Sequence, residues 1–215
     1  MPHLLHLDAS ADPRASASRT VTAAFVGAWR TRGPEFTVTS RDLQADPPPH
    51  LPDAALHWAP GLRTSGEAAE PAAEERQRVY LDELLAADVL LVGAPMYNWS
   101  LPSTLKAWVD HVHVLGTTVP FGPDGAQPLA GRTAVVVSSR GAAYDAGTPT
   151  AGWDHTVPPL QLVFGQSFGM TVEVVTVQLT LAARIPAMAG LRDRSEAEAG
   201  AARTRAFQLG STLAG

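Results

Sequence analysis

The sequence predicts an α/β domain built around a parallel β-sheet. Segments typical of strands alternate with segments typical of amphipathic helices along the whole chain. The stretch Val-Leu-Leu-Val at 89–92 has no polar alternation, which is typical of a strand buried on both faces of a parallel sheet. With 215 residues, 45% of them hydrophobic, the chain is long enough for one well-buried core but short for two. We therefore expect a single domain over residues 1–215.

The expected strands are short apolar runs that end in small or polar turn residues. They cover residues 3–7, 36–40, 89–92, 134–137 and 172–177. The first is followed by Asp-Ala-Ser at 8–10 and the second by Arg-Asp-Leu at 41–43, so each runs into a polar turn. The remaining three have the β-branched and aliphatic composition of strands in a covered sheet.

Helices are expected between the strands, at residues 18–30, 72–86, 103–115, 157–168 and 195–213. The third has the clearest pattern, because one apolar stripe carries Leu105, Trp108, Val109, Val112 and Leu115 at helical spacing. We expect this stripe to face the sheet or a partner subunit. Two segments fit neither period: residues 47–71 form a long connection with a short helix near 54–58, and residues 119–131 suggest a hairpin or excursion.

Composition narrows the classes of function. The net charge of −5 comes without a basic block, so we expect no nucleic-acid or anionic-membrane surface and a small-molecule partner instead. The chain has no cysteine, which excludes disulfides, thiolate nucleophiles and cysteine-ligated metals. Any redox chemistry must therefore use a bound organic cofactor. No signal peptide or long apolar run is evident, and we expect a cytoplasmic protein.

The loop after the first strand has the form of an anion site. It carries hydroxyls at Ser10, Ser16 and Ser18 and ends where a helix begins, so unpaired amides of the first turn lie beside them. The alternative is that Ser16 or Ser18 only caps that helix. The position in the first βα turn of a doubly wound fold favours phosphate. Neither G-x-G-x-x-G nor the P-loop pattern is present, which indicates a mononucleotide in place of a dinucleotide or a triphosphate.

The loop at 94–102 follows the third strand, where ligand loops of parallel sheets lie. Pro95 and Pro102 restrict its backbone, so it is suited to present main-chain amides to a flat ligand. Another turn of small residues follows the fourth strand at 138–144. There Gly141 would allow the backbone to approach a ligand, and Tyr144 could stack or hydrogen-bond at its edge. Three such turns at one sheet edge predict a binding site.

Two features resemble a nucleophile elbow and a metal site but lack the context that such sites need. Gly-Gln-Ser-Phe-Gly at 165–169 matches the nucleophile elbow, but a strand follows the serine where the elbow needs a helix, and no histidine lies beyond His155. We expect a helix that ends at Gly169. His111 and His113 diverge on a helix and H-E-x-x-H is absent, so no metal site is expected. No side chain is assigned a catalytic role.

With these turns assembled, the chain resembles the FMN-dependent NAD(P)H azoreductase and quinone reductase family, which has a flavodoxin-like fold. Ala-Pro-Met-Tyr-Asn-Trp at 94–99 is similar to the family's A-P-M-Y-N-F loop. Ser-Arg-Gly-Ala at 139–142 is similar to S-R-G-G, and Ser-Ala-Ser at 16–18 is similar to S-x-S. The resemblance covers nearly the whole chain and implies a five-stranded parallel sheet of order 2-1-3-4-5 with helices on both faces.

The resemblance also implies the roles of individual residues. The FMN phosphate would be held by Ser10, Ser16, Ala17 and Ser18. The flavin ring would be lined by Pro95, Met96, Tyr97, Asn98, Trp99, Ser139, Arg140, Gly141, Ala142 and Tyr144. The substrate would contact Asn98, Phe121 and Phe164, the last of them from the partner subunit of a homodimer with the site at its interface.

Three departures from the family pattern are visible. Trp99 replaces phenylalanine and keeps a flat apolar wall, while Ala142 replaces glycine and would forbid a positive φ or narrow the pocket. Residues 143–158 are longer than usual, which leaves the substrate preference open.

The implied activity is ping-pong hydride transfer from NADH or NADPH, through bound FMN, to a quinone or azo compound. Two alternatives stay open. One is a dedicated quinone or flavin reductase of a biosynthetic pathway, and the other is a non-catalytic electron carrier of the flavodoxin type.

Overall fold

A computed structural model describes residues 1–213. Within these residues a single sheet of five parallel strands has the order β2-β1-β3-β4-β5, which confirms the expected topology. Its strands are β1 (His3–Asp8), β2 (Thr37–Asp42), β3 (Val89–Gly93), β4 (Thr133–Ser139) and β5 (Thr171–Val177). All residues of β3 are buried, as expected from its unbroken apolar run. Because the strands are parallel, the turns that follow β1, β3, β4 and β5 all lie at one sheet edge.

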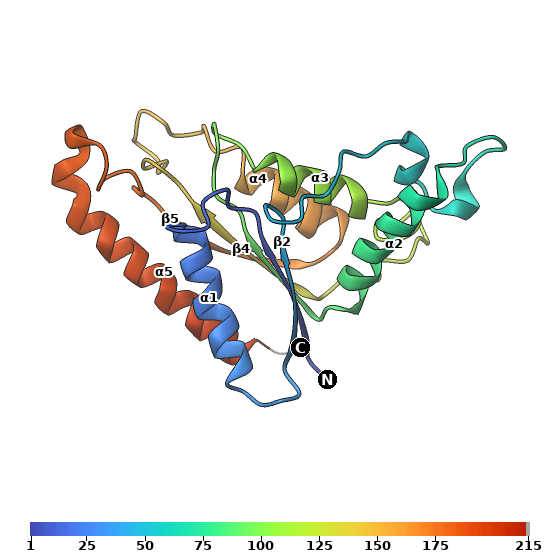
Figure 1. The fold of residues 1–215 in the computed structure, drawn as a ribbon, viewed down its shortest axis with the longest axis horizontal. Coiled ribbons are helices and arrows are strands. Elements are labelled where there is room, and N and C mark those ends of the chain that lie inside the picture. The colour runs from blue at the N-terminus through green and yellow to red at the C-terminus, as the bar shows by residue number, and fades with distance from the viewer. Residues whose placement is uncertain (214–215) are drawn as a thin grey trace.

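Helices cover both faces of the sheet (Figure 1). On one face lie α1 (Ala17–Arg30) and α5 (Arg192–Thr212), and on the other lie α2 (Pro71–Ala86), α3 (Ser103–Val112) and α4 (Val157–Leu160). The helices α1 and α5 pack closely because α5 carries a glycine where they meet. A Cβ at Gly210 would lie 2.4 Å from the carbonyl oxygen of Phe25. Shorter turns occur at η1 (Ala54–His57), η2 (Pro60–Leu62) and η4 (Pro186–Leu191).

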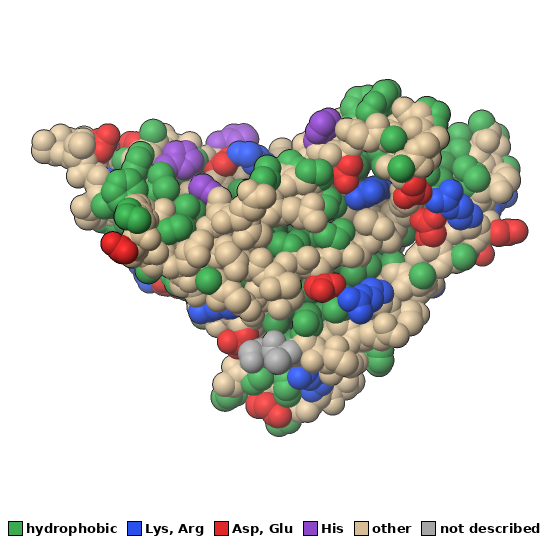
Figure 2. Space-filling view, turned by 180° about the vertical axis from the view of Figure 1, so that it is seen from behind, with side chains coloured by type: hydrophobic (Ala, Val, Ile, Leu, Met, Phe, Trp, Pro, Cys, Tyr) green, Lys and Arg blue, Asp and Glu red, His purple; other side chains and the backbone are tan. Residues whose placement is uncertain are grey.

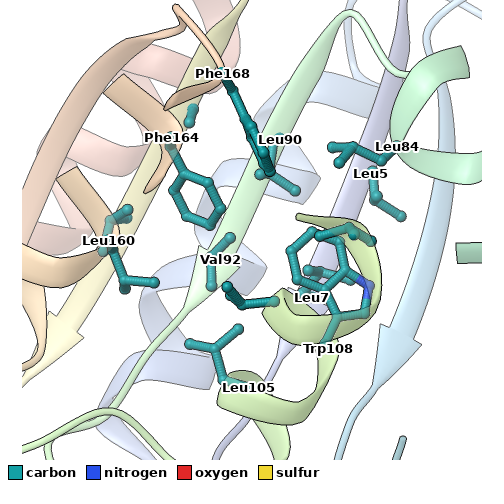
Figure 3. Packing of buried hydrophobic residues seen from close by; sticks show 14 of the residues in the cluster. Leu5, Leu7, Leu84, Leu90, Val92, Leu105, Trp108, Leu160, Phe164 and Phe168 are labelled. Carbon is teal, nitrogen blue, oxygen red and sulfur yellow. The ribbon is translucent and has the colours of Figure 1, made fainter. Parts of the chain in front are cut away.

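The larger core cluster lies between the sheet and α3 (Figure 3). Leu7 and Val92 of the sheet face Leu105 and Trp108 of the helix, and all four are fully buried. The predicted stripe of α3 therefore packs on the sheet. Burial of each such side chain contributes about 1.5–3 kcal/mol.

The helix α3 ends earlier than residue 115, where the sequence pattern places its end. Thr118 explains the difference, because its hydroxyl donates to the carbonyl oxygen of Val112 at 2.5 Å and accepts from the amide of Val114 at 3.0 Å. A side chain beyond the helix therefore occupies the groups that a further turn would use.

The expected helix at 157–168 is only partly α-helical. After α4 the chain widens into a π-helix, η3 (Gln161–Ser167), and Phe168 donates its amide to the carbonyl of Val163 at 3.0 Å. Gly169 has a φ of +72° and ends the segment, as the sequence predicts. Of the two alternatives for residues 119–131, the structure shows the excursion and not the hairpin. No strand forms there, and local turns such as that from the Gly125 amide to the Gly122 carbonyl shape the segment.

The surface has mixed charge. On the face shown in Figure 2, basic side chains lie beside acidic ones and do not form one continuous basic patch. Many are paired, such as Arg41 with Glu83 at 2.5 Å and Arg78 with Asp82 at 2.7 Å. Among the described residues, no helix combines the length and apolar character that a membrane crossing requires.

Candidate cofactor-binding site

A cleft of about 840 Å³ lies at the carboxyl edge of the sheet. One end is lined by Ser10, Ser16 and Ala17 of the loop after β1. The middle is lined by Pro95, Met96, Tyr97 and Asn98 after β3 and by Ser139 and Gly141 after β4. The far wall comes from the segment after β5. The three turns singled out in the sequence thus border one cleft.

The loop after β1 has features of both a helix cap and an anion site, the two alternatives for its serines. The Ser16 hydroxyl accepts from the amide of Arg19 at 3.2 Å and so caps α1. It also lies 3.1 Å from the hydroxyl of Ser18, which is fully buried and does not line the cleft. The amides of Ser16, Ala17 and Ser18 nevertheless donate no hydrogen bond to any described residue. Capping therefore leaves three donors at the positive end of the helix dipole.

Asp12 sets the shape of this loop. Its carboxylate accepts from the amides of Arg14 at 2.8 Å and Ala15 at 3.1 Å. These two bonds, the one from Arg14 first, hold the pKa of Asp12 below its ordinary value. The turn is thus formed by the chain itself, and the amides of the following residues remain available.

An ion pair that sequence analysis missed supports the same loop. Arg19 binds Asp42 with two bonds, of 2.8 and 2.7 Å, and donates to the carbonyl oxygen of Ser10 at 2.8 Å. The hydrogen bonds of the pair lower the pKa of Asp42 and raise that of Arg19. Asp42 ends β2 and Arg19 lies in the first turn of α1, so only the adjacency of β1 and β2 brings them together.

The loop after β3 contains a strained turn. Tyr97 and Ser100 exchange two main-chain hydrogen bonds of 2.9 and 3.1 Å. Between them Asn98 has a φ of +49° and Trp99 a φ of +65°, as in the type I′ turn of hairpins. Tryptophan in this region costs about 1–2 kcal/mol. Such strain persists where the surroundings impose it, which is common at binding sites.

Hydrogen bonds join the loop after β3 to its neighbours. The amide of Met96 donates to the carbonyl of Ser139 at 2.8 Å, and the amide of Ala11 donates to the Tyr97 hydroxyl at 2.9 Å. The same hydroxyl lies 3.3 Å from that of Ser10. The amides of Asn98 and Trp99 donate no hydrogen bond to any described residue.

In the turn after β4, Gly141 lies against the wall opposite. A Cβ there would lie 2.7 Å from Cδ1 of Leu181, so only glycine fits without a shift. Ala142 has no positive φ, and its departure from the family pattern therefore introduces no backbone strain. The amides of both residues donate no hydrogen bond within the described chain.

Arg140, Ala142 and Tyr144 do not line the cleft. The Arg140 guanidinium instead binds the carboxylate of Asp154 at 2.6 Å, and the amide of Tyr144 donates to the side chain of Gln178 at 2.7 Å. These contacts fasten the long segment 143–158 beside the cleft.

The same segment brings a second tryptophan to the rim. Trp153 meets Trp99 edge-on, with ring centroids 5.8 Å apart, and the two side chains are 48% and 49% exposed. The contact is fixed by the backbone, because the amide of His155 donates to the carbonyl of Trp99 at 2.9 Å. Sequence analysis noted the length of this segment but not its aromatic contact.

Phe121 and Phe164, which the resemblance places against substrate, do not line the cleft of the same chain. The π-helical turn directs Phe164 into the core, where it is fully buried and its ring centroid lies 6.1 Å from that of Phe168 (Figure 3). Phe121 is exposed and contacts Trp58, with centroids 6.0 Å apart. The burial of Phe164 argues against a contact with substrate, whereas a contact of the exposed Phe121 across a homodimer stays a prediction.

His111 is buried inside the protein. Burial lowers the pKa of His111, and its Nε2 lies 3.0 Å from the carbonyl oxygen of Pro49. Across residues 1–213 no group of three histidine or carboxylate side chains is arranged to hold a metal ion.

Comparison with known proteins assigns the class. A family model described as a flavodoxin-like fold matches residues 2–200. The chain aligns over 99% of its length, at an identity of 56%, with the whole of an FMN-dependent NADH:quinone oxidoreductase from Kineococcus radiotolerans. A protein of the same name from Streptomyces coelicolor is 42% identical over 93% of this chain and 92% of its own.

Solved structures agree on the fold. An azoreductase from Bacillus anthracis superposes with a TM-score of 0.79 at 21% identity, over 99% of this chain and 100% of the other. An FMN-dependent NADH-azoreductase from the same species, solved in complex with FMN, gives a TM-score of 0.78 at 20% identity over 98% and 100%. The fold and the cleft thus define a flavodoxin-like protein. Within that class, the chain belongs to the family of FMN-dependent NADH:quinone oxidoreductases.

Proposed function

We propose that this protein binds FMN in the cleft and transfers hydride equivalents from NADH to a quinone or azo acceptor. The observation that supports this most is the meeting of three loops with free main-chain amides at one sheet edge. The cleft volume of about 840 Å³ lies in the range of small-molecule sites, about 300–1,000 Å³. FMN, when bound, supplies the two-electron redox chemistry that a chain without cysteine cannot supply itself.

We assign the phosphate of FMN to the loop after β1. The amides of Ser16 and Ala17, two residues that line the cleft, are free at the amino terminus of α1, where the helix dipole favours an anion by about 0.3–1 kcal/mol. The Ser10 hydroxyl lines the same end of the cleft. The Arg19–Asp42 pair holds this loop in place through the Ser10 carbonyl.

We assign the flavin ring to the space between the loops after β3 and β4. The free amides of Asn98 and Gly141, two residues that line the cleft, are donors for the polar edge of a flat ring. Donors that are fixed in advance stabilise negative charge that develops during electron transfer, at no cost of rearrangement. Gly141 keeps the wall flat, because any side chain there would meet Leu181.

We propose further that hydride donor and acceptor use the same open side of the cleft in turn, in a ping-pong reaction. In this reaction the residues that line the cleft orient both reactants, and no side chain has to act as a general acid or base. Trp99 and Trp153 supply exposed aromatic surface at the rim for a planar acceptor. The same exposed surface is suited to the interface of a homodimer, in which the site would lie between the subunits. We propose that the enzyme acts in the cytoplasm.

Steady-state oxidation of NADH by the purified protein, with added FMN and a soluble quinone, tests this function. Continuous turnover is the expected result. Bound FMN without turnover would leave the electron-carrier alternative standing. Turnover with only one of many quinones would favour the dedicated reductase, for which the long segment 143–158 at the rim is the structural reason.

A further inference from the structure

Two arginines line the cleft without a partner. Arg14 comes from the loop after β1 and Arg184 from the segment after β5. Within residues 1–213 neither guanidinium makes a hydrogen bond or an ion pair, although other arginines beside the cleft do: Arg19 binds Asp42 and Arg140 binds Asp154. Two free positive charges at the binding cleft of a chain with net charge −5 indicate an anionic ligand.

The backbone that carries Arg184 is fixed to the turn after β4. The amide of Thr180 donates to the carbonyl of Arg140 at 3.0 Å, and the amide of Leu181 donates to that of Gly141 at 3.2 Å. The amide of Arg184 then donates to the Leu181 carbonyl at 2.9 Å and closes a turn. The guanidinium therefore extends from an ordered backbone, which reduces the entropy lost when it binds a ligand.

One carboxylate lies among these charges. Asp12 also lines the cleft, and both arginines lower its pKa, although its own backbone bonds are the larger cause. The charged side chains that line the cleft are thus two arginines and one aspartate, of which Asp12 and Arg14 come from the loop just before α1. A dianion in the cleft is attracted by the arginines, and the Asp12 carboxylate partly opposes it.

We propose that Arg14 and Arg184 form a clasp that holds the 5′-phosphate of FMN against the loop after β1. The inference rests on the proposed FMN site and adds two charged ligands to its serine hydroxyls and amides. A phosphate monoester carries nearly two negative charges at neutral pH, and arginine binds it with charge-assisted hydrogen bonds. Arg14 shares its loop with Ser10 and Ser16, which favours the phosphate of FMN over the diphosphate of NADH.

The test compares FMN with riboflavin, which has the same ring but no phosphate. Full-length protein freed of flavin is titrated with each ligand, and the dissociation constants are read from the quenching of flavin fluorescence. Arg14→Gln and Arg184→Gln should each weaken FMN binding about tenfold, since a hydrogen bond to a charged group contributes that much. Riboflavin binding should change less than about twofold.

Two further variants serve as controls. Arg203→Gln removes an exposed arginine of α5 that does not line the cleft, and it should leave both constants unchanged. Asp12→Asn keeps an acceptor oxygen for the amides of Arg14 and Ala15 but removes the opposing charge. It should therefore tighten FMN binding and leave riboflavin binding as it is. Added salt should weaken FMN binding by the parent protein more than by the arginine variants.

The outcomes distinguish failure of the arginine clasp from failure of the proposed function. Equal losses for FMN and riboflavin, or no loss for either, would overturn the clasp while FMN binding itself stands. A raised KM for NADH with unchanged FMN affinity would also overturn it, because the arginines would then bind the dinucleotide. Failure of the parent protein to bind FMN would instead refute the proposed function.

Discussion

Replacing Arg19 by methionine should destabilise the protein by about 2 kcal/mol at neutral pH. The change removes two hydrogen bonds to Asp42, of 2.8 and 2.7 Å, and one to the Ser10 carbonyl, of 2.8 Å. Bonds to charged groups contribute about 1.5–3 kcal/mol each when buried. The Asp42 side chain is 38% exposed, so solvent screening reduces the total. Methionine keeps the apolar stem, and the amides of Gln44 and Ala45 still donate to Asp42.

The loss should depend on pH in a defined direction. Arg19 holds the pKa of Asp42 below its ordinary value in the folded protein. A carboxylate with a lowered folded pKa stabilises the fold fully above its unfolded pKa, about 3.9, and that stabilisation is lost as the pH falls through the folded pKa. The difference in unfolding free energy between parent and Arg19→Met should therefore be constant from pH 7 to about pH 5 and shrink below about pH 4.

Urea unfolding followed by circular dichroism measures both effects, with Asp42→Asn as the matched background. In that background Arg19→Met should cost less and show no such shrinkage, because the charge pair is already absent. A cost that stays the same at pH 3 and pH 7, or that is unchanged in the Asp42→Asn background, would refute the reasoning.

Three other changes test the site. Tyr97→Phe removes the acceptor of the Ala11 amide and should lower the unfolding free energy by about 1 kcal/mol, which urea denaturation measures, and unchanged stability would contradict the role of that bond. Gly141→Ala would place a Cβ 2.7 Å from Cδ1 of Leu181, so titration should show severalfold weaker FMN binding, whereas unaltered binding would show that Leu181 moves freely. Trp153→Ala removes one ring of the aromatic pair at the rim and should raise the KM for a bicyclic quinone about two- to tenfold with FMN affinity unchanged; an equal effect on a monocyclic and a bicyclic quinone would argue against a stacking role.

Much of the fold follows from local sequence. The strand β3 is apolar throughout, and β4 contains an apolar run at 134–137. Composition alone therefore predicts that both lie in the middle of a covered sheet. The sheet order came from the resemblance of the loops to a family, because order depends on which crossovers the chain takes. The end of α3 was misplaced, because Thr118 competes for its last groups from outside the helical pattern.

Local sequence predicts some residues of the site and not others. Turn residues such as Ser10, Asn98 and Gly141 follow strands directly, and the parallel sheet brings them to one edge. Arg19 and Asp42 are brought together by a contact between elements distant in sequence. Arg14 and Arg184 line one cleft from segments that are also distant in sequence, so no local pattern marks either pair. The resemblance predicts that Phe164 contacts substrate, but its side chain is fully buried within the π-helical turn, which no sequence pattern reveals.

The most direct measurement is the visible absorption of the purified protein titrated with FMN. We expect saturation at one FMN per chain, an absorption band that NADH bleaches under anaerobic conditions, and recovery of the band when a soluble quinone is added. Mass spectrometry of the released chromophore should give FMN. If FMN neither binds nor stabilises the protein against unfolding, or if NADH leaves the spectrum of the bound flavin unchanged, the proposed function is wrong.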